Sequence, residues 1–505
     1  MSLAVLRSRA LSGMEAPEVS VEVHLANGLP SFTVVGLPDT EVKESRDRVR
    51  AALQNCGFEM PARRITANLA PADLPKESGR FDLPIALGIL AASGQLAAEQ
   101  LSHYEFAGEL SLSGQLRPIR GALAMTFAMQ ADGGAQRAFI LPLANADEAA
   151  LVANASIYPA HGLLDVCAHF STRDSQFRLQ RHQPAPPAIL ASYSDFADVQ
   201  GQQQARRALE VAAAGGHNVL MIGPPGAGKT MLASRFPGIL PPMSEREALE
   251  SAAVQSLSGS FRVENWKRRP FRAPHQTASG VALVGGGTVP RPGEISLAHC
   301  GVLFLDEIAE YSRKVLDVLR QPLESGLITI SRAARQADFP ARFQLIAAMN
   351  PCPCGYLGHV SGRCRCTPEA VQRYHARLSG PMLDRIDLQI EVAALAPASL
   401  GQQANASEST QAIAARVASA HALQLARQGK QNQHLSNDET VQHCRLDADA
   451  EQLLNGAMLR LHWSARTYHR LLRVARSIAD LANSEAIKRE HVAEAIQYRR
   501  VLQQF

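Results

Sequence analysis

Residues 220–233 read LMIGPPGAGKTMLA, an apolar run that passes through a glycine-rich turn into a helix-like segment. The turn fits the spacing G-x-x-x-x-G-K-[ST]. Glycines let backbone N–H groups point inward at phosphate oxygens, and the start of a helix adds positive potential. A lysine then supplies charge to the terminal phosphates, and a threonine hydroxyl is a ligand for Mg²⁺. The order strand, loop, helix predicts a triphosphate site formed by Gly223, Pro224, Pro225, Gly226, Ala227, Gly228, Lys229 and Thr230.

Two further apolar runs end in polar side chains. GVLFLDEIAE at 301–310 delivers Asp306 and Glu307 to the end of a predicted strand, which is the ligand edge of a parallel sheet. Asp306 is suited to hold Mg²⁺, and Glu307 is suited to polarise the attacking water as a general base. FQLIAAMN at 343–350 ends in Asn350, whose amide is suited to orient that water. A turn-forming asparagine is the alternative at this position.

The composition bounds the class of protein. A chain of 505 residues, 46% of them hydrophobic, is long enough for about three domains of roughly 100–200 residues. The net charge of +4 argues neither for nor against nucleic acid, so a basic surface has to be local. The first residues are unlike a signal peptide, and no run of about 18 apolar residues offers a membrane span. We therefore expect a soluble cytoplasmic protein.

The organisation along the chain predicts a multidomain α/β protein. Residues 1–170 alternate strand-like runs such as VSVEVHL with helical runs such as EVKESRDRVRAALQNCGF. Prolines 184, 186 and 187 mark a linker over 171–190. Strands and helices alternate again over 191–398, as a parallel sheet requires. From 399 to 505 the spacing is helical.

The wording of several segments resembles one family closely. The quoted loop region, FRAPHQTAS, GEISLAHCGVLFLDE and RLSGPMLDRIDL are similar to the magnesium-chelatase-like branch of AAA+ ATPases. Within that branch the resemblance is to the bacterial YifB/ComM proteins, and it covers essentially the whole chain. It implies an AAA+ core at 191–398, with Asn350 as sensor 1, and a helical lid at 399–505. Arg385 matches the arginine finger, for which a salt bridge to Asp384 or Asp387 is the alternative. Arg466 matches the sensor 2 arginine of the lid.

The resemblance also implies a function. ComM-like members are described as hexameric helicases that drive branch migration of DNA during natural transformation, so we expect a homo-hexamer, ATP and Mg²⁺, single-stranded and branched DNA, and recombination proteins as partners. One rival is a chelatase-type subunit that remodels a protein partner without DNA. Others are an ATP-dependent protease and a DNA-binding regulator in which hydrolysis is only a switch.

Three segments suggest where DNA would bind. FRVENWKRRPFRAPH at 261–275 interleaves aromatic residues with Arg268, Arg269 and Arg272, a mixture suited to base stacking and phosphate contact. GLITISRAARQADFPARFQ predicts a hairpin with Arg332 and Arg335 near its turn, where related ring helicases place a pore hairpin. ALVGGGTVPRPGE is a glycine-rich loop where this branch carries an insertion. A solvated basic face is the alternative for each segment.

A cysteine cluster follows Asn350. Residues 352–366 read CPCGYLGHVSGRCRC, a CxC–x9–CxC pattern whose thiolates can close a tetrahedral Zn²⁺ site. His359 is a competing ligand, and reduced thiols or a redox pair are the alternatives to zinc. The candidate zinc ligands are Cys352, Cys354, Cys364 and Cys366.

The N-terminal domain, at 108–149 above all, resembles the proteolytic domain of Lon, which uses a serine–lysine dyad. Where that family presents its serine, this chain reads Gly79-Arg80-Phe81-Asp82, with Ser78 a few residues early. Where it presents its lysine, this chain offers Leu123 and Met125. A hydroxyl without an amine base cannot be activated. We therefore expect a Lon-like fold, residues 1–170, without peptidase chemistry.

Overall fold

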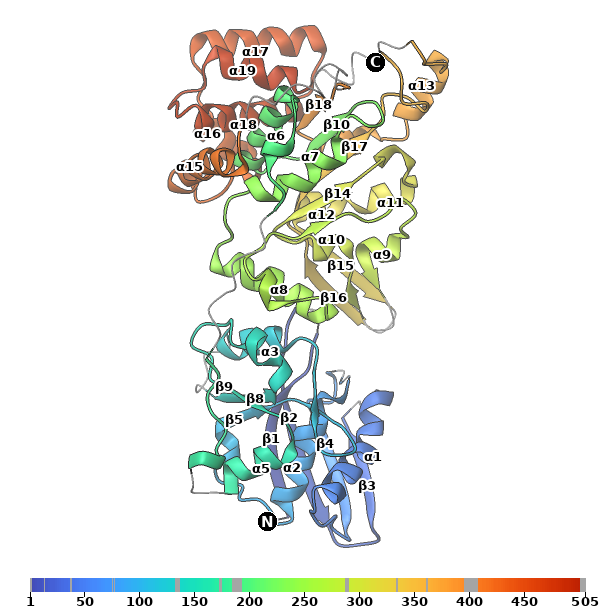
Figure 1. Cartoon of the computed structure of the whole chain (residues 1–505), viewed down its shortest axis with the longest axis vertical. Helices are drawn as coiled ribbons and strands as arrows, with labels where there is room; N and C mark the ends of the chain where they lie inside the picture. The colour runs from blue at the N-terminus through green and yellow to red at the C-terminus, as the bar shows by residue number, and fades with distance from the viewer. Residues whose placement is uncertain are drawn as a thin grey trace.

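The computed structural model describes residues 2–499 apart from 13, 37–38, 75, 77, 132–136, 172–174, 184–192, 287–289, 333–334, 360–361 and 395–406. The molecule is elongated, with the N-terminal sheet at one end, a second α/β layer in the middle and a group of helices at the other end (Figure 1). Among the described helices, none combines the length and apolar character needed to cross a bilayer.

The N-terminal sheet has seven strands in the order β3-β4-β2-β1-β5-β8-β9. Its strands are β1 (Leu3–Arg9), β2 (Glu18–Ala26), β3 (Ser31–Val35), β4 (Arg64–Ala70), β5 (Tyr104–Phe106), β8 (Ala138–Pro142) and β9 (Ile157–Ala160). The period-two run VSVEVHL at 19–25 lies in strand β2, as predicted. Strand β1 lies inside the sheet, antiparallel to β2 and parallel to β5. The sequence pattern did not predict a strand at these residues.

Helices and a short hairpin complete this part. The helices are α1 (Thr40–Asn55), α2 (Asp82–Ala92), α3 (Ala122–Ala131), α4 (Ala146–Ala149) and α5 (Leu163–Ser171). Asp39 caps α1 by accepting from the Val42 N–H at 2.9 Å, and every residue of α2 is buried. The short strands β6 (Glu109–Leu110) and β7 (Leu116–Arg117) pair as an antiparallel hairpin, while β5 joins the main sheet.

Part of the predicted linker at 171–190 is described. The His182 N–H donates to the Ile157 carbonyl at 2.8 Å, and the His182 ring contacts Asp147 at 2.7 Å. These contacts hold the start of the segment against the N-terminal sheet.

The middle layer is a parallel sheet of five strands in the order β11-β14-β17-β10-β18. Its strands are β10 (Val219–Ile222), β11 (Phe271–Arg272), β14 (Val302–Leu305), β17 (Gln344–Met349) and β18 (Leu388–Glu391). Strands β10 and β14 are buried on both faces, as expected for a parallel sheet covered by helices. Because all five run the same way, the residues after β10, β14 and β17 meet at one edge.

Short helices and hairpins surround this sheet. The helices are α6 (Gln203–Gly215), α7 (Lys229–Arg235), α8 (Glu245–Ser258), α9 (Gly280–Val284), α10 (Glu294–Leu297), α11 (Arg313–Val318), α12 (Arg320–Ser325), α13 (Pro368–His375) and α14 (Gly380–Leu383). The hairpins pair β12 (Gly285–Gly286) with β13 (Arg291–Pro292), and β15 (Leu327–Arg332) with β16 (Arg335–Pro340).

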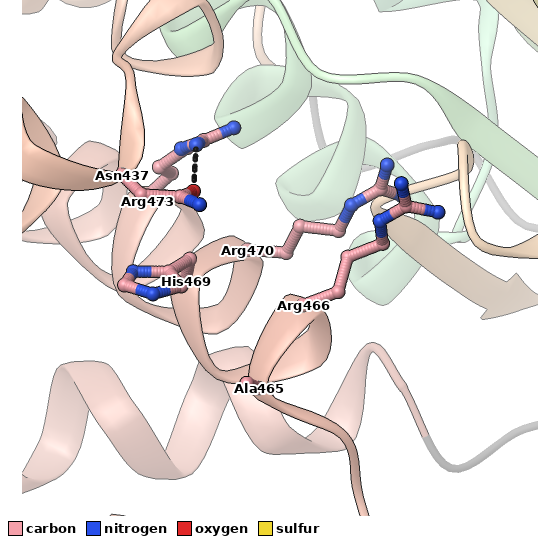
Figure 2. Close-up of a pocket in the computed structure, with 6 residues that line it drawn as sticks. All are labelled: Asn437, Ala465, Arg466, His469, Arg470 and Arg473. Atoms are coloured by element: carbon pink, nitrogen blue, oxygen red, sulfur yellow. Dashed lines mark hydrogen bonds between the residues drawn. The ribbon is translucent and has the colours of Figure 1, made fainter.

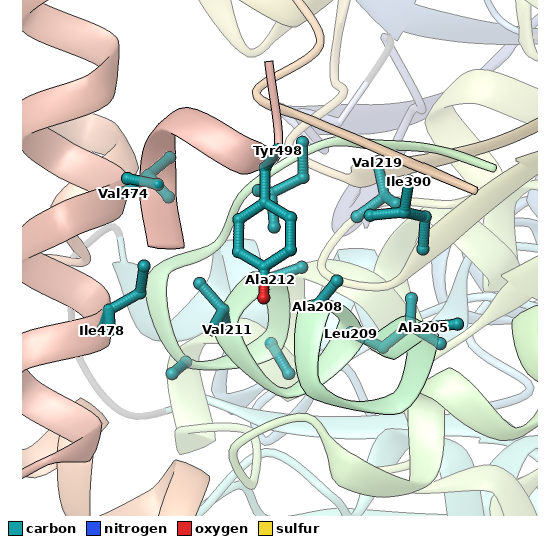
Figure 3. Packing of buried hydrophobic residues seen from close by; sticks show 14 of the residues in the cluster. Ala205, Ala208, Leu209, Val211, Ala212, Val219, Ile390, Val474, Ile478 and Tyr498 are labelled. Carbon is teal, nitrogen blue, oxygen red and sulfur yellow. The ribbon is translucent and has the colours of Figure 1, made fainter. Parts of the chain in front are cut away.

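Helix α6 packs between the sheet and the C-terminal helices. The side chains on its buried face are small or branched, and the same cluster contains Val219 and Ile390 of the sheet (Figure 3). Val474 and Ile478 approach from α18, and Tyr498 follows α19. Such close packing makes the orientation of the C-terminal helices sensitive to the position of α6.

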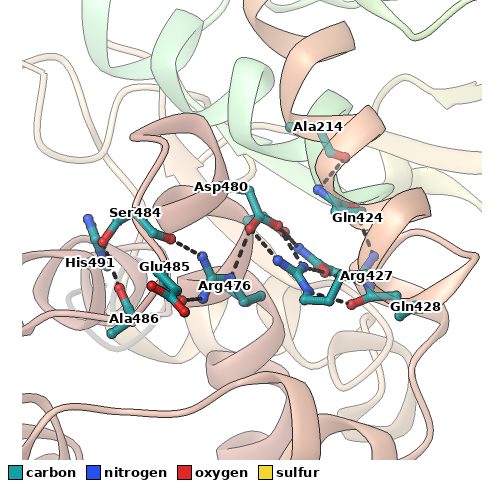
Figure 4. Close-up of polar contacts among 12 residues, drawn as sticks. Ala214, Gln424, Arg427, Gln428, Arg476, Asp480, Ser484, Glu485, Ala486 and His491 are labelled. Atoms are coloured by element: carbon teal, nitrogen blue, oxygen red, sulfur yellow. Dashed lines mark hydrogen bonds and ion pairs between the residues drawn. The ribbon is translucent and has the colours of Figure 1, made fainter.

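The C-terminal helices are α15 (Thr410–Gln428), α16 (Asn437–His443), α17 (Ala448–Leu461), α18 (Ala465–Leu481) and α19 (Arg489–Gln497). A buried carboxylate organises them. Asp480 accepts two hydrogen bonds from Arg427, at 2.7 and 3.0 Å, and one from Arg476 at 2.9 Å (Figure 4). Gln424 donates to the Ala214 carbonyl at the end of α6, which ties α15 to the central layer.

The N-terminal and central layers are joined by an apolar contact. Leu123 and Ala124 of α3 share a buried cluster with Ala248 and Ala252 of α8. Ser256 of α8 also donates to Glu148 at 3.3 Å. Burial raises the pKa of Glu148.

Candidate nucleotide site and its surroundings

The phosphate loop lies between β10 and α7. Gly228 has φ = +90° and begins α7, a conformation that favours glycine. The Lys229 ammonium donates to the carbonyls of Gly223 and Pro224 at 2.6 and 3.0 Å, and to Asn350 Oδ1 at 3.1 Å. Burial lowers the pKa of Lys229, against the opposing charges of Asp306 and Glu307. The structure therefore brings the predicted lysine and Asn350 into direct contact.

The carboxylates after β14 lie beside the loop. Thr230 Oγ1 donates to Asp306 Oδ2 at 2.8 Å, so a hydroxyl and a carboxylate meet at the start of α7. Both are hard oxygen ligands of the kind Mg²⁺ takes. Glu307 is exposed and has φ = +50°, a rare conformation for a residue with a side chain and one that clusters at functional sites.

One contact on the loop was not anticipated. Gln202 precedes α6, has φ = +54°, and donates from Nε2 to the carbonyls of Ala227 and Ala393 at 3.2 and 2.7 Å. It joins the phosphate loop to the chain after β18. The sequence carries no local signal for this role, because the partners lie 25 and 191 residues away.

Arg385 lies at the end of the sheet where the parallel strands begin, opposite the end that carries the phosphate loop. It precedes β18, and its carbonyl accepts from Asn218 Nδ2 at 2.9 Å just before β10 begins. The phosphate loop starts where β10 and β18 end. The four residues of β18, about 13 Å of strand, separate the start of the loop from the end of the sheet near Arg385. The guanidinium pairs with Glu324 and donates to the Pro381 carbonyl at 2.6 Å. The partner is thus neither Asp384 nor Asp387, and Arg385 lies away from the phosphate loop of its own chain.

Arg466 lies in the same region. Its Nη2 is 3.9 Å from Glu324 Oε1, the oxygen that Arg385 contacts. Arg466, His469, Arg470 and Arg473 line one side of a pocket of about 360 Å³ on the first turns of α18 (Figure 2). Burial lowers the pKa of Arg385, and the charges of Arg466 and Arg470 add to that effect against Glu324. Positive charge is therefore concentrated here.

The arginines of this face differ in how they are held. Arg473 donates to Thr440 Oγ1 at 3.0 Å and to Asn437 at 3.3 Å, so it braces the helices. Arg470 Nη1 is 3.9 Å from Asp387 Oδ1 and has no hydrogen-bond partner in the described part of the chain. Arg466 is the most exposed of the three, with 56% of its side chain accessible.

The basic stretch at 261–275 makes several internal contacts, and its role as a single-strand surface stays a prediction. Arg269 donates to the carbonyls of Pro241 and Cys300 at 2.7 and 2.6 Å, and Arg272 forms two 2.7 Å bonds to Glu294. Arg268 lies over the Tyr193 ring at 4.8 Å. The aromatic residues also serve the interior: Trp266 is buried, and Phe271 stacks on Phe304. These side chains hold the domain together, because the interleaved pattern supplies internal partners.

The predicted hairpin is present as β15 and β16, with Arg332 paired to Arg335 in the backbone register beside the turn. It lies between β14 and β17 in the chain. The side chains of these two arginines lie outside the described part of the structure. In the glycine-rich loop, the described residues form the short β12–β13 hairpin.

The four clustered cysteines come together. The Cys352 sulfur is 3.4 Å from that of Cys354 and 3.8 Å from that of Cys364, and Cys354 and Cys364 are 3.6 Å apart. All four sulfurs, including that of Cys366, lie within 4.8 Å of one another. Among the described residues the group contains no atom of His359, whose ring contacts Tyr356 instead. Backbone N–H donors, that of Tyr356 foremost, lower the pKa of the Cys354 thiol to about 6.

In the N-terminal domain, the described residues at the positions compared with the serine–lysine dyad of Lon have other neighbours. Phe81 and Leu123 are fully buried. Ser78 accepts from Arg80 at 2.9 Å, and the nearest lysine in sequence, Lys76, donates to the Pro71 carbonyl. Leu123 packs against the central layer. The position expected for an amine base is occupied by an interdomain contact.

Comparisons with known proteins agree with this organisation. Three family models match: "Magnesium chelatase, subunit ChlI" over residues 195–400, "Subunit ChlI of Mg-chelatase" over 21–145, and "Magnesium chelatase, subunit ChlI C-terminal" over 407–499. Competence protein ComM of Haemophilus influenzae is 51% identical over 504 residues, which are 99% of this chain and 98% of that protein. The chain belongs to the YifB/ComM family. The uncharacterized protein YifB of Salmonella typhimurium is 50% identical over the same shares of the two chains.

Other matches are weaker. Lon protease 2 of Bacillus subtilis is 26% identical over 194 residues, 34% of this chain. This chain thus combines a magnesium-chelatase-like AAA+ region with a faint likeness to Lon and a helical C-terminal region. Membership of this family implies an ATPase that uses ATP and Mg²⁺.

Proposed function

We propose that the protein is a hexameric, ATP-driven DNA motor that promotes branch migration and extends heteroduplex during natural transformation. The proposal starts from the 51% sequence identity to competence protein ComM, a relative whose name links it to competence. The observation that carries it is the separation of Arg385 from the phosphate loop by the length of the sheet. A site built in this way is completed by a second copy of the chain.

Within one chain, the residues at the loop divide the work of hydrolysis. The loop and Lys229 bind the phosphates, and Thr230 and Asp306 would hold Mg²⁺, which shields the phosphate charge when bound. Glu307 accepts the proton of the attacking water, and Asn350 orients that water. The bond between Lys229 and Asn350 supports this role, because it keeps the amide at the loop.

The neighbouring chain supplies the remaining charges. Arg385 approaches the γ-phosphate of the adjacent site as the arginine finger, and Arg466 acts beside it. Their shared position at Glu324 supports joint action. A head-to-tail contact of this kind repeats into a ring, and six copies are proposed from the family resemblance.

DNA is proposed to lie against the β15–β16 hairpin. Arg332 and Arg335 flank its turn, and the hairpin lies in the chain between Glu307, which follows β14, and Asn350, which follows β17. A change at the nucleotide thus has a short covalent route to the hairpin. The proposed partners are single-stranded and branched DNA and recombination proteins. The proposed location is the cytoplasm. The cofactors are Mg²⁺ and, at the four-cysteine group, Zn²⁺.

The experiment is a measurement of ATPase rate and mass in solution. Purified protein is mixed with ATP, with or without single-stranded DNA, and its oligomeric state is followed by mass photometry. We expect hexamers and a rate that rises several-fold with DNA. Hexamers whose ATPase rate is the same with and without DNA would support a chelatase-type remodeller of a protein partner. Monomers under all conditions would contradict both functions.

A further inference from the structure

The four-cysteine group is joined directly to the nucleotide site. Strand β17 ends at Met349, Asn350 follows, and Cys352 is two residues further on. Asn350 accepts from Lys229 of the phosphate loop, while Cys352 is fully buried. The residue between them, Pro351, is also held, because its carbonyl contacts His375 Nε2 at 2.9 Å.

The sulfur positions fit one metal ion. Zinc–thiolate bonds of about 2.3 Å place tetrahedral sulfurs about 3.8 Å apart. The separations among the sulfurs of Cys352, Cys354 and Cys364 are 3.4, 3.6 and 3.8 Å, close to this value and far above the length of a disulfide bond, about 2.05 Å. Four sulfurs without an oxygen or nitrogen ligand favour Zn²⁺ over Mg²⁺ or Ca²⁺.

The backbone around the sulfurs is arranged in tight turns. The Gly355 N–H donates to the Cys352 carbonyl at 2.9 Å, which closes a turn that carries Cys352 and Cys354. The N–H groups of Tyr356 and Arg365 donate to the sulfur of Cys354. Donors of this kind fix the orientation of metal ligands and offset their negative charge.

The same turn touches the phosphate loop. Gly355 has φ = +83°, and a methyl group placed on it would lie 2.6 Å from Pro225 Cδ and 3.8 Å from Asn350 Cγ. The backbone of Gly355 therefore lies in van der Waals contact with the proline ring of the phosphate loop. A turn held by a metal would fix both that ring and the asparagine.

We propose that Cys352, Cys354, Cys364 and Cys366 bind one Zn²⁺, and that the metal-bound turn supports the phosphate loop and Asn350. Binding the ion displaces the remaining thiol protons to solvent and needs no oxidant. The four cysteines and Gly355 are positioning residues, because they act on the reaction through Pro225 and Asn350. The second half of this proposal rests on the proposed ATPase function, and the first half does not.

The metal is tested on the full-length protein by elemental analysis and native mass spectrometry. We expect one zinc per chain, retained in Glu307→Gln and in the buried control Cys444→Ser, and lost in the double variant Cys364→Ser/Cys366→Ser. Cobalt exchanged into the protein should give the visible spectrum of a tetrahedral thiolate site. Protein without metal, or with disulfide-linked cysteines in this group, would overturn the zinc assignment.

The mechanical role is tested by two glycines of the same loop. Gly355→Ala places a methyl group against Pro225, whereas a methyl group on Gly358, whose φ of +73° is similar to the +83° of Gly355, meets nothing within 4 Å. We expect Gly355→Ala to lower kcat for ATP by about 10–100-fold with zinc retained, the range found when groups that orient metal ligands are perturbed. Gly358→Ala should keep kcat within about twofold of the wild type, because it introduces backbone strain similar to that of Gly355→Ala without a contact to Pro225.

The outcomes separate the two claims. Equal kcat values in the two glycine variants would overturn the supporting role while leaving the zinc site in place. ATP hydrolysis that persists in Glu307→Gln would contradict the proposed function instead, and the metal content would be unaffected by that result.

Discussion

Replacing Arg385 by alanine is expected to abolish ATP hydrolysis while leaving the chain folded. The Arg385 side chain is only 10% exposed, but that of its partner Glu324 is 53% exposed, so the ion pair contributes about 1 kcal/mol. The hydrogen bond to the Pro381 carbonyl adds about 1 kcal/mol. A total near 2 kcal/mol lowers the melting temperature by a few degrees and does not unfold a domain of this size.

The effect on the rate is far larger if Arg385 acts on a neighbouring site. An arginine finger contributes about a thousandfold or more to kcat. One four-residue strand, about 13 Å long, separates the backbone of Arg385 from the phosphate loop of its own chain. We therefore predict that the loss arises between copies, and this can be measured directly.

The assay mixes Arg385→Ala with Glu307→Gln, two chains that are each inactive alone. In a random ring, half of the sites belong to chains that keep Glu307, and half of their neighbours keep Arg385. About one quarter of the seams are then complete, so we expect about a quarter of the wild-type ATPase rate after the chains exchange. The control mixes Glu307→Gln with Lys229→Ala, which restores no site because both defects lie on the nucleotide-binding chain.

A mixture that stays inactive, although native mass spectrometry shows mixed rings, would refute action between copies. Equal recovery in the control mixture would refute the assignment of Glu307 and Lys229 to the same chain's site.

Three further predictions concern the scaffold. Asp480→Asn leaves Arg427 and Arg476 without a buried carboxylate and should lower the free energy of unfolding by about 3–5 kcal/mol, measured by urea denaturation of the C-terminal helices. Burial lowers the pKa of His217 below 6.5, so near neutral pH and below it the unfolded chain binds a proton that the folded chain excludes. The free energy of unfolding should therefore decrease as the pH falls below about 6.5, and it should decrease less steeply in His217→Gln. Thermal melts from pH 7.5 to 5.5 measure this dependence. Arg269→Ala removes bonds to two carbonyls and should lower the melting temperature with unchanged DNA affinity by fluorescence anisotropy.

The nucleotide loop could be predicted because its chemistry is local. The spacing from Gly223 to Thr230, and the strands that end in Asp306 and Asn350, each fit within about ten residues. The structure brings Lys229 to Asn350 and Thr230 to Asp306, as parallel strands with a common ligand edge require.

Other features depended on contacts between distant residues. Arg385 and Arg466 meet at Glu324, which lies 61 residues before Arg385 and carries no motif. The basic stretch at 261–275 predicts a DNA surface, and the sequence does not show that Arg269 donates to carbonyls 28 and 31 residues away. A sequence pattern shows that charge and aromatic rings alternate, but it does not show which of them face solvent.

The cysteine group lies between these cases. Spacing alone left zinc, reduced thiols and a redox pair open, because CxC pairs suit all three. The separations between the sulfurs, and the contact of Gly355 with Pro225, come from the folding of the loop against the nucleotide site.

The central claim is that ATP hydrolysis at Glu307 moves DNA strands. The most direct measurement is the conversion of a three-strand DNA junction, followed on a native gel, by the wild-type protein and by Glu307→Gln at equal concentration. We predict ATP-dependent conversion by the wild type and none by the variant, although both bind the junction. Equal conversion by the two proteins, or none by a wild type that hydrolyses ATP, would contradict the account.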